Sequence, residues 1–285
     1  MKSQPLISVQ HLAERLRTMD SLILDCRWDL GDPAGSRHAY AQGHVPGAIH
    51  VDLDTDLSDL SRAGLGRHPL PSAFAFGETL SKWGWHPGRP VVAYDDAGGA
   101  LAAARLWWML RLVGAEHCQV LDGGFAAWQK ARMPIETTES AVAASVVTVD
   151  FDEQQLVGFD ALERGLADAS ICLVDARGAA RYRGEVEPLD RLPGHVPGAV
   201  NRPFTDNLDA QGFFRPAKSL AEDFQALVGR RPVDSVVHMC GSGVTACHNL
   251  LAMEHAGLHG SRLFAPSWSG WIADSARPVA VGSGP

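Results

Sequence analysis

Cysteine, long apolar runs and positive charge are all in short supply in this chain. Its 285 residues include only five cysteines, an odd number and too few for a disulfide framework, which favours a reducing compartment. No stretch approaches the roughly 18 apolar residues of a membrane span, and the first ten residues lack the continuous apolar segment of a secretion signal. These absences predict a cytoplasmic protein with no membrane partner.

The charge balance excludes a further class of partner. The 25 basic residues are outnumbered by 33 acidic ones, giving a net charge of -8, and no basic stripe interleaved with aromatic residues occurs. We therefore expect no nucleic-acid partner. The length predicts two domains of ordinary size, each able to bury its own core.

The chain repeats itself at about half its length. The hexapeptide Gly-His-Val-Pro-Gly-Ala occupies residues 43–48 and recurs at residues 194–199. Three further pairs recur in the same order, namely residues 24–27 with 174–177, residues 91–95 with 236–240, and Trp128 with Trp271. Because the order is kept and the offsets drift by only a few residues, the sequence indicates a duplicated domain.

Each half alternates expected strands with expected helices. Short apolar runs bounded by turn residues predict strands at 22–26, 91–94, 171–174 and 236–239. Helices are expected at 100–112, 155–167 and 245–255. This alternation predicts an α/β fold in which each half is a parallel sheet flanked by helices. The expected domains are 1–135 and 151–285, joined by a linker at 136–150 that has no amphipathic period.

One cysteine lies in a segment that suits a nucleophile. Cys240 ends the apolar run 236–239 and opens a turn with two glycines, after which residues 246–257 have a helix-forming composition. We therefore expect Cys240 between a strand end and a helix start. The amides of residues 241–245 can point at an anion there, and the helix N-terminus adds positive partial charge. Such a setting stabilises a thiolate.

The run Cys-Gly-Ser-Gly-Val-Thr at 240–245 resembles the active-site loop of the rhodanese family. It is similar to the form found in 3-mercaptopyruvate sulfurtransferases, whereas thiosulfate sulfurtransferases typically have Arg-Lys where Gly241 and Ser242 stand. Together with the repeat, the resemblance covers nearly the whole chain. It implies two tandem rhodanese-like domains and no cofactor. It also implies that Cys240 takes sulfur from a small-molecule donor, holds it as a persulfide, and passes it to a thiol such as that of thioredoxin, or to cyanide.

The duplication indicates which half is active. Asp95 stands in the first half where Cys240 stands in the second, and a carboxylate cannot carry a sulfane sulfur. The first domain is therefore expected to be catalytically silent. For Asp95 itself, a role as a turn residue that satisfies backbone amides is at least as good an interpretation as a contact with substrate.

Several arginines follow the second-half strand at 171–174. Arg181 matches the substrate-binding arginine of the family, and a planar guanidinium suits a carboxylate donor. The resemblance implies a second arginine nine residues later, but Asp190 stands there and Arg191 beside it, so Arg191 is the candidate. Arg177 repeats as Arg27 in the silent half, which indicates a structural role.

The resemblance implies further site residues. Ser242, His68 and Asp54 match a serine, histidine and aspartate set that would polarise the keto group of a donor or relay a proton to its leaving enolate. The loop around the cysteine is expected to contact the donor through Gly241, Gly243, Val244 and Thr245. Gly270 replaces the acid of the family pattern Ser-Trp-x-Glu-Trp, so any role of that acid is lost.

Other interpretations remain to be weighed. His238, Cys247 and His248 lie near Cys240, but their spacing does not match paired zinc ligands, so no metal is expected. No lysine follows the glycines as in a P-loop, and Ala246 stands where a cysteine phosphatase needs an arginine. The alternatives are a thiosulfate sulfurtransferase and a non-catalytic sulfur-carrier or binding module, and the latter typically lacks the cysteine.

Overall fold

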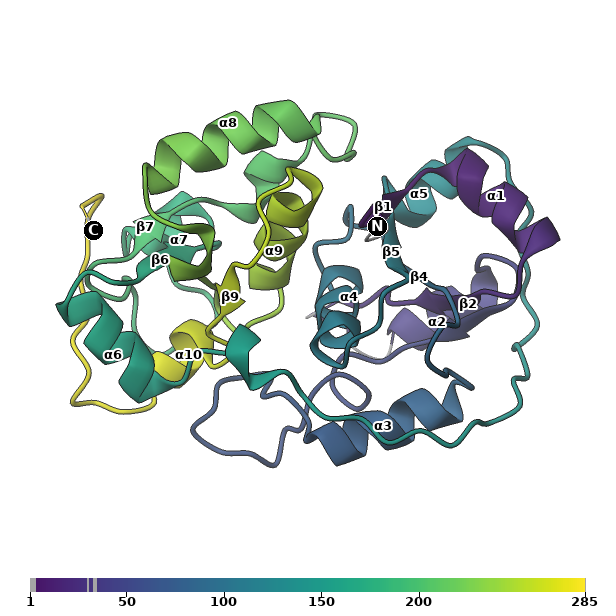
Figure 1. Cartoon of the computed structure of the whole chain (residues 1–285), viewed down its shortest axis with the longest axis horizontal. Helices are drawn as coiled ribbons and strands as arrows, with labels where there is room; N and C mark the ends of the chain where they lie inside the picture. Colours follow the sequence, from purple (N-terminus) through teal and green to yellow (C-terminus); the bar gives the residue numbers. More distant parts are fainter. Residues whose placement is uncertain (1–3, 30, 33–34, 285) are drawn as a thin grey trace. The chain divides into compact units, whose positions relative to one another are not determined.

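The computed structural model describes residues 4–29, 31–32 and 35–284, and these residues form two compact units (Figure 1). The first unit is drawn mainly from the first half of the chain and continues to Asp152, and the second is drawn mainly from the residues that follow. Each unit also takes a loop from the other half of the sequence. Asp59–Leu70 belongs to the second unit, and Ala210–Phe214 belongs to the first.

The first unit is built on a five-stranded parallel sheet with the order β1-β5-β4-β2-β3. The strands are β1 (Leu6–Ile7), β2 (Leu22–Asp25), β3 (Ala48–His50), β4 (Val91–Tyr94) and β5 (Cys118–Leu121). The helices are α1 (Val9–Thr18), α2 (Gly35–Gln42), α3 (Ala73–Lys82), α4 (Ala103–Leu112) and α5 (Gly124–Lys130). Every residue of β2 and β4 is buried, as expected for central strands of a sheet covered on both faces.

The second unit repeats this plan in a four-stranded parallel sheet with the order β7-β6-β8-β9. Its strands are β6 (Cys172–Asp175), β7 (Val200–Asn201), β8 (Val236–Met239) and β9 (Arg262–Leu263). Its helices are α6 (Phe159–Ala167), α7 (Ala179–Tyr182), α8 (Ala217–Val228), α9 (Ala246–His255) and α10 (Ser267–Trp271), with short 3-10 turns at Glu153–Gln155, Phe204–Asn207 and Val233–Ser235. Helices α8 and α9 are seen on one side of this sheet in Figure 1, and α6 and α10 on the other. The predicted α/β architecture is confirmed.

Four strands of the first sheet match the second sheet in order, so that β5, β4, β2 and β3 correspond to β9, β8, β6 and β7, and β1 is additional. The register also repeats, since Leu22 lies opposite Val91 on β4 and Cys172 lies opposite Val236 on β8. The central strands β4 and β8 therefore end at equivalent places, directly before Asp95 and Cys240.

A buried arginine brace is duplicated as well. Arg27 binds Asp25 at 2.6 Å and the carbonyl of Gly43 at 2.8 Å. Arg177 likewise binds Asp175 at 2.6 Å, and the carbonyl of Gly194 at 2.7 Å. The brace ties the end of a central strand to the start of the repeated hexapeptide in both units. This geometry supports the structural interpretation of Arg177.

Two predicted helices start later than the sequence patterns suggested. The expected helix at 155–167 begins at Phe159, because the amide of Val157 donates instead to the carbonyl of Leu263 and extends the β9 edge. The expected helix at 100–112 begins at Ala103, because the amide of Leu101 is turned toward the carboxylate of Asp95. In both cases a backbone amide of the expected first turn donates to a group from another element, so the helix begins later.

The predicted linker at 136–150 has no helix, and its one pairing is an isolated bridge between Glu136 and His44. The amides of Ser145 and Val147 donate to Ser81, at the end of α3. The segment is therefore fastened along the first unit by its backbone. Its exact limits as a linker stay a prediction.

Candidate functional site

Cys240 lies directly after β8, and its side chain is almost fully buried. Its Sγ atom accepts a hydrogen bond from the amide of Gly243 at 3.2 Å, and its own amide donates to Ser267 Oγ at 3.1 Å. Gly243 has φ +79°, a conformation that favours glycine and turns its amide back toward the sulfur. Helix α9 starts three residues later, so its N-terminus also faces this loop. The arrangement is an amide cradle suited to a sulfur anion.

The equivalent loop of the first unit shows what such a cradle holds. The buried carboxylate of Asp95 accepts hydrogen bonds from the amides of Ala97, Gly99, Leu101 and Ala103, at 2.9, 2.7, 3.0 and 3.3 Å. Burial raises the pKa of Asp95 to about 6, although these four amides oppose the rise. The interpretation of Asp95 as a residue that satisfies backbone amides therefore agrees with the geometry. A side chain that cannot carry sulfur fills the place of the nucleophile.

Two of the predicted polar site residues meet although they lie far apart in sequence. His68 Nδ1 and Ser242 Oγ are 2.8 Å apart, and both side chains are buried. His68 is carried by the loop Asp59–Leu70, which belongs to the same unit as Cys240. A hydroxyl paired with an imidazole can polarise a carbonyl group or pass on a proton.

Asp54, the third member of that set, lies in the first unit. Its amide donates to Asp52 Oδ1 at 2.9 Å and its side chain is half-buried. Burial raises the pKa of Asp54, and the neighbouring carboxylate of Asp52 adds to the effect. Its participation in the site stays a prediction.

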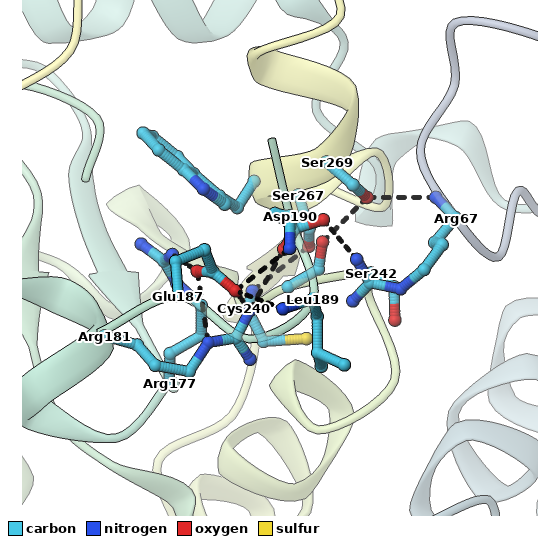
Figure 2. A network of polar contacts seen from close by, with 12 residues as sticks. Arg67, Arg177, Arg181, Glu187, Leu189, Asp190, Cys240, Ser242, Ser267 and Ser269 are labelled. Carbon is cyan, nitrogen blue, oxygen red and sulfur yellow. Dashed lines mark hydrogen bonds and ion pairs between the residues drawn. The ribbon is translucent and has the colours of Figure 1, made fainter. Parts of the chain in front are cut away.

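Arg181 lies on α7 and is held by two carboxylates (Figure 2). Its Nη2 atom is 2.7 Å from Glu187 Oε1 and 3.0 Å from Asp190 Oδ2, and its Nε atom donates to Glu187 Oε2 at 3.2 Å. Burial alone would raise the pKa of Glu187, but hydrogen bonds from Arg181 and from two backbone amides hold that pKa below its ordinary value. Burial raises the pKa of Asp190 despite the nearby arginines. Figure 2 shows this cluster beside Cys240.

The other predicted arginine is engaged elsewhere. Arg191 Nη2 donates to the carbonyl of Ile272, after α10. The residue that joins the cluster instead is Arg67, whose Nη1 atom binds Asp190 Oδ1. Sequence reasoning missed Arg67, although it directly precedes His68 and so offered a signal.

The three residues considered with Cys240 as metal ligands each have another environment. His238 Nε2 lies 3.1 Å from Met253 Sδ. Burial is the larger cause, and the positive charge of Arg202 the smaller cause, that lower the pKa of His238 to about 3. His248 Nδ1 lies 3.0 Å from the side-chain amide of Asn207, and Cys247 is buried in α9 with its Sγ 3.4 Å from the carbonyl of Gly243. The described part of the chain contains no group of three or more such side chains arranged to hold a metal ion.

Among the described residues, no helix combines the length and apolar character that crossing a bilayer requires.

Comparison with known proteins places these features in a family. The model of the rhodanese-like domain matches twice, at residues 8–131 and 159–274. A Pseudomonas aeruginosa protein named a probable 3-mercaptopyruvate sulfurtransferase is 45% identical over 284 residues, which cover 99% of this chain and 100% of the relative. SseB of Mycobacterium tuberculosis, provisionally named a thiosulfate sulfurtransferase, is 39% identical over 99% of both chains.

A solved structure agrees with the sequence relatives. The 3-mercaptopyruvate sulfurtransferase of Leishmania major superposes with a TM-score of 0.83 at 32% identity, covering 93% of this chain and 73% of that chain. The family model accounts for both units, including the strands that precede Asp95 and Cys240. This chain therefore belongs to the rhodanese family, with two rhodanese-like domains in tandem.

Proposed function

We propose that this protein is a sulfurtransferase that moves sulfur from 3-mercaptopyruvate to a thiol or cyanide through a persulfide on Cys240. The observation that carries the proposal is the amide cradle after β8, in which Sγ of Cys240 accepts the Gly243 amide. Relatives that match nearly the whole length of this chain support the choice of donor.

In the first half-reaction, the Cys240 thiolate attacks the sulfur atom of 3-mercaptopyruvate. An S–S bond forms, the donor C–S bond breaks, and its electron pair passes to the enolate of pyruvate. Protonation of that enolate at carbon gives pyruvate. The cradle amides stabilise the negative sulfur before the attack and the persulfide after it.

Ser242 and His68 act on the leaving group in this proposal. The hydroxyl of Ser242 donates to the keto oxygen as it gains enolate charge, and His68 orients that hydroxyl through their 2.8 Å contact. Arg181 binds the donor carboxylate through Nη1, since Glu187 and Asp190 occupy its Nε and Nη2 atoms.

In the second half-reaction, an acceptor thiolate attacks the outer sulfur of the persulfide. The acceptor leaves with the sulfur, and the Cys240 thiolate is restored. We propose a thioredoxin-type dithiol as the acceptor, with cyanide as a laboratory substitute. The five cysteines are free, which supports a reducing compartment, and we propose the cytoplasm.

The persulfide can be tested by mass spectrometry of the intact protein. Incubation with 3-mercaptopyruvate should add the mass of one sulfur atom, and Cys240→Ser should abolish both the mass gain and turnover. Cys247→Ser is the matched control, because Cys247 is also buried near the loop but lies on the helix. Turnover that survives in Cys240→Ser, or label found on Cys247, would contradict the proposal.

The donor can be tested separately, because the relative SseB carries the name of a thiosulfate enzyme. We expect kcat/KM for 3-mercaptopyruvate to exceed that for thiosulfate, with cyanide and reduced thioredoxin as acceptors. The opposite order would leave the persulfide chemistry intact and make this protein a thiosulfate sulfurtransferase.

A further inference from the structure

Two guanidinium groups converge on the residue that follows the nucleophile. A Cβ atom added at Gly241 would lie 3.0 Å from Arg67 Nη2 and 3.6 Å from both terminal nitrogens of Arg181. Arg67 comes from the loop Asp59–Leu70 and Arg181 from α7, so two distant parts of the sequence contribute the two cations. Gly241 has no side chain to separate them from the loop beside Cys240.

Both arginines keep hydrogen-bond donors unused. Arg67 binds Asp190 through Nη1, whereas its Nε atom is buried and has no partner among the described residues. Its Nη2 atom faces Gly241. Nε and Nη2 form one edge of a guanidinium, the edge that binds a carboxylate with two parallel hydrogen bonds. Arg181 uses Nε and Nη2 for Glu187 and Asp190, and Nη1 has no hydrogen bond to the part of the chain that the structure describes.

The approach of Arg67 is built into the backbone. A Cβ atom at Gly66, which has φ +96°, would lie 2.5 Å from the carbonyl oxygen of Pro266, and one at Gly270 would lie 3.2 Å from the amide of Gly66. Two glycines therefore let the loop lie directly against α10. Ser269 Oγ then accepts the amide of Arg67 at 2.9 Å and donates to the carbonyl of Gly241 at 2.8 Å. One serine links the backbone of Arg67 to the loop after the nucleophile.

Asp190 holds the two arginines together. One of its oxygens binds Arg67 and the other binds Arg181, and its side chain is only 4% exposed. A carboxylate shared in this way fixes the spacing of the two guanidinium groups without occupying the free edge of Arg67. Glu187 and Asp190 also balance the two positive charges, which suits a donor with a single negative charge better than a dianion.

We propose that Arg67 is a second donor-binding residue, which binds the carboxylate of an α-keto acid donor together with Arg181, and that Asp190 is the residue that positions both. The proposal deepens the proposed function and rests on it. Its residues are assigned from the contacts at Gly241, whereas Arg191 is occupied by the carbonyl of Ile272.

Steady-state kinetics of Arg67→Gln test the proposal. We expect the KM for 3-mercaptopyruvate to rise about tenfold or more, the loss typical of a charge-assisted hydrogen bond, with a smaller change in kcat. Arg62→Gln is the matched control, since Arg62 lies on the same loop and its guanidinium donates to the carbonyl of Leu70, at 2.9 Å, away from the cluster at Gly241. Its KM should stay within about twofold of the wild type. An equal KM in Arg67→Gln and the wild type, with unchanged thermal stability, would overturn the proposal.

A binding measurement separates this proposal from the sulfur-transfer chemistry. Calorimetry of the Cys240→Ser protein with pyruvate needs no turnover, and Arg67→Gln in that background should weaken pyruvate binding about tenfold. Equal pyruvate affinity with and without Arg67→Gln would refute the role of Arg67, whereas a missing persulfide in the wild type would refute the proposed function instead.

A double-mutant cycle tests the role of Asp190. If Asp190 positions Arg67, the KM increase caused by Arg67→Gln should be clearly smaller in an Asp190→Asn background than in the wild type. Asp190→Glu should restore part of the difference, because it keeps the shared carboxylate. Equal increases in both backgrounds would show that Asp190 does not act through Arg67.

Discussion

Replacing Asp95 with asparagine should change how the stability of the protein depends on pH. The carboxyl of Asp95 is fully buried, and its pKa is raised by burial to about 6 from an ordinary value of 3.8. At 1.36 kcal/mol per pKa unit, this difference corresponds to about 3 kcal/mol. Between about pH 4 and 6 the folded protein keeps a proton that the unfolded chain has lost. The free energy of unfolding should therefore fall as the pH rises through this window, by up to about 3 kcal/mol, and become level above it.

Asp95→Asn removes this contribution, so the variant should gain stability relative to the wild type as the pH rises from 4 to 7. Urea unfolding followed by tryptophan fluorescence at several pH values measures the difference, and carbon NMR of the Asp95 carboxyl gives its titration midpoint directly. Parallel stability curves, or a midpoint near the ordinary value, would refute the reasoning. Either result would mean that the four amides fully offset burial in this loop, and that a cradle of this kind favours an anion more strongly than we infer.

Two further predictions concern the donor. Arg181→Ala should raise the KM for 3-mercaptopyruvate about tenfold or more, because a charged hydrogen bond to the donor is lost, whereas Arg191→Ala should have a smaller effect because Arg191 binds the carbonyl of Ile272. Equal KM values for these two folded variants would contradict the assignment. The double change Gly241→Arg with Ser242→Lys should shift the ratio of kcat/KM values toward thiosulfate, since it adds positive charge near the cysteine and removes the hydroxyl that contacts His68. An unmoved ratio would assign the selectivity to the arginines instead.

The fold could be predicted because the sequence patterns that indicate it occur in both halves of the chain and involve residues close together in the sequence. The hexapeptides at 43–48 and 194–199 set the period, and the apolar runs at 91–94 and 236–239 became the central strands β4 and β8. The structural role of Arg177 followed from its copy, Arg27. Helix starts were less predictable, since a carbonyl or carboxylate from another element can accept a hydrogen bond from an amide of the first turn, as those of Leu263 and Asp95 do.

The candidate site was predictable only in part, because tertiary contacts decide which arginines lie at the site and which bind other parts of the fold. Arg177, Arg181 and Arg191 lie within one stretch of sequence and have the same chemistry, yet one braces the fold, one lies at Gly241, and one binds a backbone carbonyl. Nothing local to Arg191 indicates that Ile272 will occupy it. Spacing along the chain therefore pointed to Arg191, whose role in donor binding stays a prediction, and did not point to Arg67, which binds Asp190.

The loop Asp59–Leu70 belongs to the second unit although it lies in the first half of the sequence, and this placement explains why Arg67 was not predicted as a site residue. Its placement depends on the close approach of Gly66 to Pro266, some 200 residues away in the sequence, which no pattern in either segment encodes by itself. Because His68 and Arg67 are adjacent on this loop, its placement brings His68 to Ser242 and also brings Arg67 to Asp190. A family pattern could suggest His68 because its residue type is shared, but Arg67 becomes visible only through its position. If the loop were displaced, both contacts would be lost together, so the His68–Ser242 pair and the Arg67–Asp190 ion pair are structurally coupled.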